Sequence, residues 1–527
     1  MATLDWVIVA IYAAGLIGLS YWLSKGQSTT TDYYLGSKGL KWWQIGLSTM
    51  ATQLSAVSFI SAPAFVGLRE NGGLQWLTYE FAVPLAMIFL IIFIFPPLYK
   101  SGVISIYSYL GRRFGSSTNK ILSGVFQFSR AFATGITVYA VAIVLEAVFG
   151  IPLWINILLT GVIALIYDYL GGMKAIVISD VIQMGILFLG FIICSYVAYD
   201  LIGGWGSFVE NLDRDRLDAV SFTNTGLGDG SEFGFWPMVL GGFFLYAAYY
   251  GCDQSQAQRI LSSSDMKNVR RALLFNGFMR FPTVFLYCVM GLLIGTFALM
   301  TPEFLSLIPE GRSDYLVPLF IVEQLPVGLV GLLVAAILAA AMSSLDSALN
   351  SLSAATVEDF VIPAKSKNEK PTEAESFRLS KKYTIVWGVV CVLLAFSAGN
   401  IAPTVIEAIN KVGSMFNGPI IATFVLAILT KTATTKGVNI GIVAGVAFNL
   451  VLWLFFDDVI FWFWWNLTGF LVTVTVAMIV SRWADSDAPL SIIDGTAKIE
   501  FRLTESAYLT LYFVFIVLFS MSLAFWL

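Results

Sequence analysis

The segment Gln44–Arg69 reads QIGLSTMATQLSAVSFISAPAFVGLR, and it decides the fold class. It has about the length of a helix that crosses the ~30 Å hydrocarbon core of a bilayer. Its middle, Ala51–Ser58, is small and polar, and Pro63 and Gly67 follow. This composition predicts a membrane helix that unwinds midway and frees carbonyl oxygens to bind a cation. Small residues that only allow close helix packing are the alternative.

The rest of the chain has the same membrane character. Of 527 residues, 58% are hydrophobic and 12% are charged, against roughly 45–50% and 25% in soluble proteins. Apolar runs recur from end to end, which predicts a single all-α polytopic membrane domain. The first run is long and has no basic leader, so it is expected to remain as a span. About 14 transmembrane helices are predicted, at residues 4–24, 44–69, 76–97, 121–148, 152–171, 175–200, 235–259, 272–299, 325–358, 382–398, 402–429, 435–456, 458–481 and 507–527.

The basic residues divide unequally between the two sides of this topology. Of the 30 lysines and arginines, four fall on one side: Arg69, Arg214, Arg216 and Arg312. Three lie inside predicted spans: Arg130, Arg280 and Lys411. The remaining 23, which include Arg259, fall on the other side. Basic loops stay in the cytoplasm. Both termini are therefore expected outside a multi-pass cell membrane protein, in a plasma or inner membrane.

Residue content argues against an enzyme. The chain has no histidine, the commonest general base. Its four cysteines have no paired spacing, and no nucleotide-binding glycine loop is present. Gradient-driven transport is expected, in a lipid bilayer, with no nucleic acid and no obligatory protein partner.

A second polar cluster lies in the predicted span 325–358. Helical spacing places Ala340, Ser343, Ser344 and Ser347 on one face, with Asp346 at its edge. Hydroxyl and carboxylate oxygens suit a hard cation such as Na⁺. Alternatively, the serines bond back to carbonyls one turn earlier, and only Asp346 needs a further role.

Dispersed charges inside the predicted spans leave alternatives open. Glu80 and Arg280 are interpreted as a structural ion pair or as the polar floor of a solute site. Glu407 and Lys411, four residues apart on one helix, are predicted to pair locally. Arg130 either neutralises an acid or binds a carboxylate. The pattern alone indicates an ion-coupled carrier or channel.

Several motifs resemble the sodium/solute symporter family, whose members carry sugars, monocarboxylates, vitamins, iodide or sialic acid. They are Thr31–Gly36, Tyr169–Gly172 with Ser179–Gln183, Gln256–Arg259, Ser343–Asn350 and Thr356–Asp359. The resemblance implies two inverted five-helix repeats, each with a broken first helix. The ranges are a leading helix at 4–24, a first repeat at 44–200, a second repeat at 235–429 and trailing helices at 435–527. The charge pattern agrees, because an odd number of spans reverses the entry side of the second repeat.

The resemblance also implies two sodium sites. The first would use backbone oxygens and two hydroxyls, from Ala51, Leu54, Ala340, Ser343 and Ser344. Some members have a second site, which corresponds here to Asp180, Ser343, Asp346 and Ser347. Asp346 stands where those relatives have serine, so the acid either strengthens cation binding or makes it sensitive to protons.

The implied solute site comprises Gln53, Ser55, Glu80, Tyr246, Arg280 and Asn410, with Tyr249 at the inner gate. Arginine and asparagine replace the lysine and glutamine of sugar carriers, which fits a carboxylate as readily as a sugar. The expected function is sodium-coupled uptake of a sugar, polyol or small carboxylate by alternating access. Proton coupling through Asp180 and Asp346, and a solute-gated channel or sensor, are the alternatives.

Overall fold

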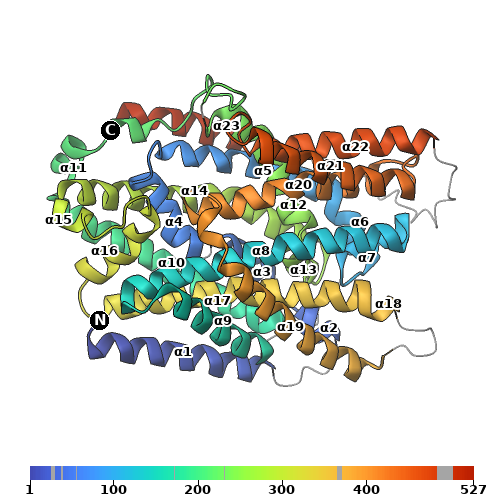
Figure 1. Cartoon of the computed structure of the whole chain (residues 1–527), viewed down its shortest axis with the longest axis horizontal. Helices are drawn as coiled ribbons and strands as arrows, with labels where there is room; N and C mark the ends of the chain where they lie inside the picture. The colour runs from blue at the N-terminus through green and yellow to red at the C-terminus, as the bar shows by residue number, and fades with distance from the viewer. Residues whose placement is uncertain are drawn as a thin grey trace.

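The computed structural model describes residues 1–24, 30–36, 39–54, 56–170, 173–230, 232–364, 371–483 and 503–526. These parts of the chain form helices and no β-strand, which confirms the all-α prediction. Long helices run side by side along the longest axis, with α1 at the lower edge in Figure 1 and α22 and α23 at the upper edge.

The helices follow in chain order, with η marking 3₁₀ or π turns. They are α1 (Thr3–Ser24), α2 (Thr30–Leu35), α3 (Trp42–Gln53), α4 (Ala56–Gly67), η2 (Leu74–Phe81), α5 (Ala82–Phe89), η3 (Leu90–Ile94), α6 (Phe95–Ser101), α7 (Ile106–Phe114), α8 (Ser116–Phe149), α9 (Leu153–Leu170), α10 (Met173–Ile202), α11 (Trp205–Asn211), η4 (Arg214–Leu217), η5 (Pro237–Gly241), α12 (Gly242–Cys252), α13 (Gln254–Leu261), α14 (Met266–Met300), α15 (Pro302–Leu305), η6 (Ser313–Tyr315), α16 (Leu316–Gln324), α17 (Leu329–Thr356), η7 (Val357–Val361), α18 (Ile362–Ala364), α19 (Glu373–Ala395), η9 (Ala398–Asn400), α20 (Val405–Leu429), α21 (Thr435–Phe456), α22 (Trp464–Trp483) and α23 (Leu503–Trp526).

Within the described residues, nine helices are long and apolar enough to cross a membrane, or ten if the bent pair α3 and α4 is one span. Every predicted span coincides with helical structure. The other four predicted spans, around α9, α12 with α13, α17 and α19, are not among these nine or ten within the described residues. The chain is a multi-pass membrane protein, and the count of 14 stays a prediction, as do the repeat boundaries.

Both chain ends lie at the same end of the bundle. Figure 1 shows the N- and C-termini at its left end, together with α11 and α15, while α7 and α18 lie at the right end. The loop after α11 holds Arg214 and Arg216, two of the four basic residues that the charge pattern places outside. Termini on a common side agree with the predicted topology, and its orientation in the membrane stays a prediction.

Two helices are interrupted where the sequence predicts a broken helix. Helix α3 ends at Gln53, Leu54 leaves the helical conformation, and α4 continues at an angle of 53°. Helix α12 ends before Asp253, whose backbone is extended, and α13 follows. The Asp253 carboxylate accepts a hydrogen bond of 2.8 Å from the Ser255 N–H and so caps α13. Both breaks leave helix ends inside the bundle, available to ligands.

The second half of the first broken helix, α4, is held tightly against α14. A Cβ atom on Gly67 would lie 2.3 Å from the Gly291 carbonyl oxygen, and one on Gly295 would lie 2.3 Å from the Gly67 oxygen. Only glycine allows the two backbones to approach this closely. The packing therefore sets the position of α4 relative to Arg280, which lies on α14.

Candidate functional site

A cavity of about 130 Å³ lies where the two broken helices face each other. Gln53 and Ser58 line it from the first break, and Tyr249 and Asp253 from the second. Helices α8, α14, α17 and α20 complete the wall. Helix breaks provide unpaired backbone groups inside the membrane, which is where transporters of broken-helix design bind their cargo.

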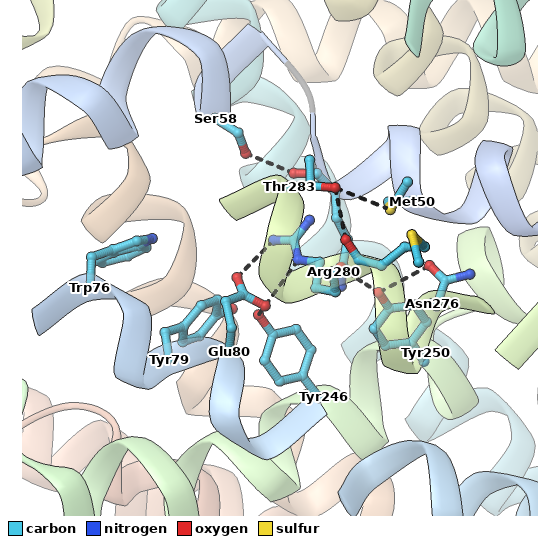
Figure 2. A network of polar contacts seen from close by, with 12 residues as sticks. Met50, Ser58, Trp76, Tyr79, Glu80, Tyr246, Tyr250, Asn276, Arg280 and Thr283 are labelled. Carbon is cyan, nitrogen blue, oxygen red and sulfur yellow. Dashed lines mark hydrogen bonds and ion pairs between the residues drawn. The ribbon is translucent and has the colours of Figure 1, made fainter. Parts of the chain in front are cut away.

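The cavity wall contains a buried ion pair between Arg280 and Glu80. The Arg280 Nε and Nη2 atoms lie 3.0 Å and 3.1 Å from the two Glu80 carboxylate oxygens. The Tyr246 hydroxyl donates to the same carboxylate at 2.8 Å, and Figure 2 shows that carboxylate between Arg280 and Tyr246. Arg280 lines the cavity, whereas Glu80 and Tyr246 are fully buried behind it. The arrangement orients the guanidinium and balances its charge.

Two amides of the predicted solute site line the cavity and are held by tyrosines. The Tyr250 hydroxyl donates to Gln53 Oε1 at 2.6 Å, and the Tyr79 hydroxyl donates to Asn410 Oδ1 at 3.0 Å. Both carbonyl oxygens are therefore engaged, which directs the amide N–H groups elsewhere. The Asn410 amide donates to the Ile406 carbonyl at 2.8 Å. Ser55, the other predicted solute ligand at the first break, lies outside the described residues.

A second arginine, Arg130 on α8, lines the same cavity. Its Nη1 atom lies 3.6 Å from Asp253 Oδ2, and its guanidinium carbon lies 5.6 Å from the Tyr249 ring centroid. The predicted gate residue Tyr249 thus contacts a cation. The sequence marks Arg130 as an intramembrane charge without assigning its partner. The sequence did not assign Asp253 to the site, because it lies inside the predicted span 235–259 and the helix end that it caps appears only in the structure.

The predicted first sodium site combines the first break with α17. Helix α17 contacts both α3 and α4. Ala51 and Leu54 are buried at the end of α3, and Ser344 is buried on α17, where it lines the cavity. The side chains of Ala340 and Ser343 lie outside the described part of the structure. The last carbonyls of a helix lack intrahelical donors, so this end of α3 can supply oxygen ligands.

Two residues of the predicted second sodium site, Asp180 and Ser347, contact an arginine side chain. Asp180 on α10 forms an ion pair with Arg259 on α13, with 3.2 Å between Oδ2 and Nη2, and both side chains are completely buried. Ser347 accepts a hydrogen bond from the same guanidinium. Asp346 is also buried, with 1% of its surface exposed. Arg259, which the charge pattern counts on the basic side, is completely buried, because α13 packs it against Asp180.

The predicted Glu407–Lys411 pair on α20 is wrong. Glu407 instead receives two contacts from Arg69 at the end of α4, at 2.7 Å and 3.1 Å. Lys411 forms an ion pair with Asp457 at 2.5 Å. Arg69 also lies 2.9 Å from Glu232. Neighbouring helices provide shorter charge contacts than one helical turn, and buried charges take the closest partner.

Comparison with known proteins identifies relatives along most of the chain. The model of the sodium:solute symporter family matches residues 33–445. Human sodium-coupled monocarboxylate transporter 1 is 30% identical over 457 residues, covering 85% of this chain and 72% of that protein. A putative sodium-dependent multivitamin transporter of Drosophila melanogaster is 31% identical, covering 85% and 75%. The sodium/glucose cotransporter of Vibrio parahaemolyticus is 28% identical, covering 86% and 85%.

Solved structures share the fold. A sodium-coupled sialic acid symporter, in a substrate-bound outward-open state, matches with a TM-score of 0.81 and 23% identity, over 93% of this chain and 99% of that one. A transporter of the nucleobase-cation-symport-1 family matches with a TM-score of 0.59 and 13% identity, over 91% and 99%. The similarity covers more than nine-tenths of this chain in both cases.

Proposed function

Since the chain belongs to the sodium:solute symporter family, whose members are sodium-coupled transporters and not enzymes, we propose that it imports a small carboxylate together with Na⁺. The observation that carries this proposal is the presence of two arginines in one cavity wall. Arg280 and Arg130 both line the cavity. A sugar or polyol is the second candidate, because the amides of Gln53 and Asn410 line the same space.

Both guanidinium groups keep capacity for a further hydrogen bond. Among the described residues, Arg280 Nη1 and Arg130 Nε are buried without a hydrogen-bond partner. A buried donor without a partner costs about 1–3 kcal/mol, more when it is charged, and a bound carboxylate would remove that cost. The Arg130–Asp253 distance of 3.6 Å exceeds that of a strong charge-assisted bond, so Arg130 can turn toward an anionic ligand.

The cavity size supports a small solute. A volume of about 130 Å³ is well below the ~300–1,000 Å³ of pockets that hold drug-sized ligands. Tyr79 and Trp76 supply apolar surface beside the arginines. A short carboxylate with a small apolar part fits this combination of size and charge better than a sugar does.

Sodium coupling follows from the position of the first break. We place Na⁺ between the carbonyls of Ala51 and Leu54 at the first break and the α17 residues Ala340, Ser343 and Ser344. An ion held there would fix the break, and the break also carries Gln53 and Ser58 into the solute cavity. Solute and ion would thus each stabilise the other's site, which is the requirement for coupling. A potential of −100 mV supplies about 2.3 kcal/mol for each charge moved inward.

Uptake into proteoliposomes tests the proposal. Labelled short monocarboxylates, sugars and polyols are compared with external Na⁺ or with choline at constant pH. We expect uptake of a carboxylate that requires Na⁺ and is competed by other short carboxylates. Uptake that survives in choline would support proton coupling through Asp180 and Asp346. Currents far above carrier turnover would support a channel, and exclusive uptake of sugars would overturn the carboxylate assignment.

The proposed function also implies an arrangement of the helices in the membrane. The first repeat spans 44–200 and the second 235–429, with 4–24 before them and 435–527 after them. Both termini lie outside a plasma or inner membrane, and the basic loops lie inside. Accessibility of a cysteine introduced near either terminus to an impermeant reagent checks the orientation.

A further inference from the structure

A second cavity, of about 390 Å³, lies between the loop helix η6 and the segment that leads into α20. Its lining comes from the segments 310–315 and 398–408, with Tyr139 and Ile143 on α8. No residue of this lining also lines the solute cavity. Arg312, one of the four basic residues that the charge pattern places outside, lies in its wall. The cavity therefore belongs to the side of the membrane that is predicted to be outside.

Asp314 in η6 lines this cavity and is 6% exposed. Its Oδ2 atom accepts a hydrogen bond of 2.9 Å from the Val405 N–H, and the Ser61 hydroxyl also bonds the carboxylate. Its other oxygen, Oδ1, is buried without a hydrogen-bond partner among the described residues. A buried acceptor without a partner is costly, above all when it is charged. The free oxygen of Asp314 thus marks a position for a ligand.

Among the described residues, no side-chain cation pairs with Asp314. Glu80 and Glu407 are equally buried acids, and each forms an ion pair with an arginine. The charge that acts on Asp314 is that of Glu407, another acid, which disfavours a second negative charge nearby. Arg312 lies in the same cavity wall, but its guanidinium bonds the Tyr315 side chain instead. Buried acids that lack a cationic partner bind a metal ion or take up a proton.

The N-terminus of α20 compensates only part of this charge. Val405 is the first residue of that helix, and its N–H donates to Asp314. The N-terminus of a helix carries roughly half of a positive elementary charge. About half of the negative charge of Asp314 therefore stays unbalanced in a desolvated position.

We propose that the Asp314 carboxylate binds a sodium ion from the outside solution, at a site that the transport cycle does not empty. A monovalent ion suits one carboxylate, whereas divalent ions take several acidic ligands, and the described residues contain no group of three acids or other strong ligands that could hold a metal ion. Tyr139 and Thr404, which carry hydroxyl oxygens, line the same cavity. Oxygen ligands of this kind suit a hard cation, and the volume leaves room for water to complete its shell.

The position of the site separates it from the cargo. Asp314 belongs to a loop helix and does not line the solute cavity, so an ion there goes beyond the proposed function and is not counted in it. Such an ion would join η6, α4 and α20, because Ser61 lies on α4 and Val405 begins α20. Ser61 also accepts the Ile406 N–H at 3.0 Å. Since α20 carries Asn410 into the solute cavity, the ion would stabilise two helices that border that cavity.

A comparison of bound with transported sodium tests the inference on the full-length protein. Equilibrium binding of radioactive Na⁺ to purified protein counts the bound ions. The ratio of Na⁺ to labelled solute taken up by proteoliposomes counts the transported ions. A proton is the other occupant that removes the charge, so both measurements are made at about pH 8, where Asp314 is ionised although burial raises its pKa to about 6. We expect the wild type to bind one Na⁺ more than it transports with each solute.

Variants assign the additional ion to Asp314. Asp314→Asn keeps an acceptor for the Val405 N–H but removes the charge, so it should bind one Na⁺ fewer than the wild type and transport with an unchanged ratio. Glu310→Gln, at an exposed acid that lines the same cavity, is the matched control and should behave as the wild type does.

The outcomes separate this inference from the proposed function. Equal sodium binding by the wild type and a folded Asp314→Asn variant overturns the site and leaves sodium coupling intact. A transport ratio that falls by one in Asp314→Asn also overturns it, because the ion would then be cargo. Should Asp314→Asn fail to fold, the wild-type counts decide, and equal numbers of bound and transported ions contradict the inference. Uptake that survives in choline, with one bound Na⁺ that Asp314→Asn removes, would support the site and overturn sodium coupling.

Discussion

Arg280 on α14 and Glu80 on η2 are joined by two parallel hydrogen bonds of 3.0 Å and 3.1 Å in the wall of the cavity. The pair links two helices 200 positions apart in the chain. Of the two residues, only Arg280 lines the cavity. Glu80 therefore affects the cavity by holding the Arg280 guanidinium in place. A paired guanidinium presents its Nη1 donor to the cavity without a large net charge in the membrane.

The Arg280–Glu80 pair should separate stability from transport. Arg280→Ala leaves a buried carboxylate unpaired, and we expect a loss of about 3–5 kcal/mol of stability together with uptake. The double variant Arg280→Met with Glu80→Leu should regain most of the thermal stability and still not transport. Thermal unfolding in detergent and proteoliposome uptake measure the two effects. Recovery of uptake in the double variant would contradict the placement of Arg280 at the solute.

Arg130 should determine affinity for carboxylates. Arg130→Gln removes a charged donor worth about 1.5–3 kcal/mol, so KM for a carboxylate should rise roughly ten- to hundredfold. Arg130→Lys keeps the charge and should lose less. Arg112→Gln, at an exposed position of α7, is the control. An unchanged KM in Arg130→Gln would exclude contact with the solute.

Ser344 should affect the sodium dependence of uptake. Ser344→Ala removes one proposed hydroxyl ligand, and the Na⁺ concentration for half-maximal uptake should rise several-fold, as expected for about 1 kcal/mol. Ser351→Ala is the matched control, because the Ser351 hydroxyl on the same helix bonds the Ala348 carbonyl at 2.8 Å. Equal sodium dependence in both variants would place the ion elsewhere.

The two acids that contact Arg69, Glu407 and Glu232, should contribute differently to the free energy of unfolding. The Glu407 side chain is 3% exposed and that of Glu232 is 49% exposed. Glu407→Gln should therefore lower stability by several kcal/mol, because it removes the partner of a largely buried arginine. Glu232→Gln should cost less than about 1 kcal/mol. Thermal unfolding of both variants checks the order, and similar losses would mean that Glu232 is the main partner.

Protonation of Asp314 should make the free energy of unfolding depend on pH. It lies in the loop helix η6, where burial raises its pKa to about 6, while hydrogen bonds from Ser61 and the Val405 N–H oppose the rise. The folded protein holds this proton to a higher pH than the unfolded chain, whose aspartates titrate near 3.9. The contribution is therefore largest below about pH 4 and is lost as pH rises to about 6.

Comparison of variants isolates this contribution. Wild-type protein should lose more stability between pH 4.5 and 6.5 than Asp314→Asn, by at most about 3 kcal/mol. Asp218→Asn, at an exposed loop acid, should behave as the wild type does. Identical pH profiles for wild type and Asp314→Asn would contradict the prediction.

The sequence by itself predicted the all-α membrane fold and the first break, while the second break followed from the family resemblance. Apolar runs and the sided basic loops depend only on local composition, because each segment meets lipid or water on its own. The small, polar stretch before Ser58 predicts the first break for the same reason, since it favours unwinding wherever the helix lies. Family motifs then indicate sodium coupling.

Only the tertiary structure decided which charges meet. Arg69 rather than Lys411 pairs with Glu407, and Arg259 pairs with Asp180. Each pairing joins helices far apart in the chain, and a buried charge takes whichever partner the packing brings closest. Local sequence cannot encode that choice, because it depends on how the two broken helices turn inside the bundle.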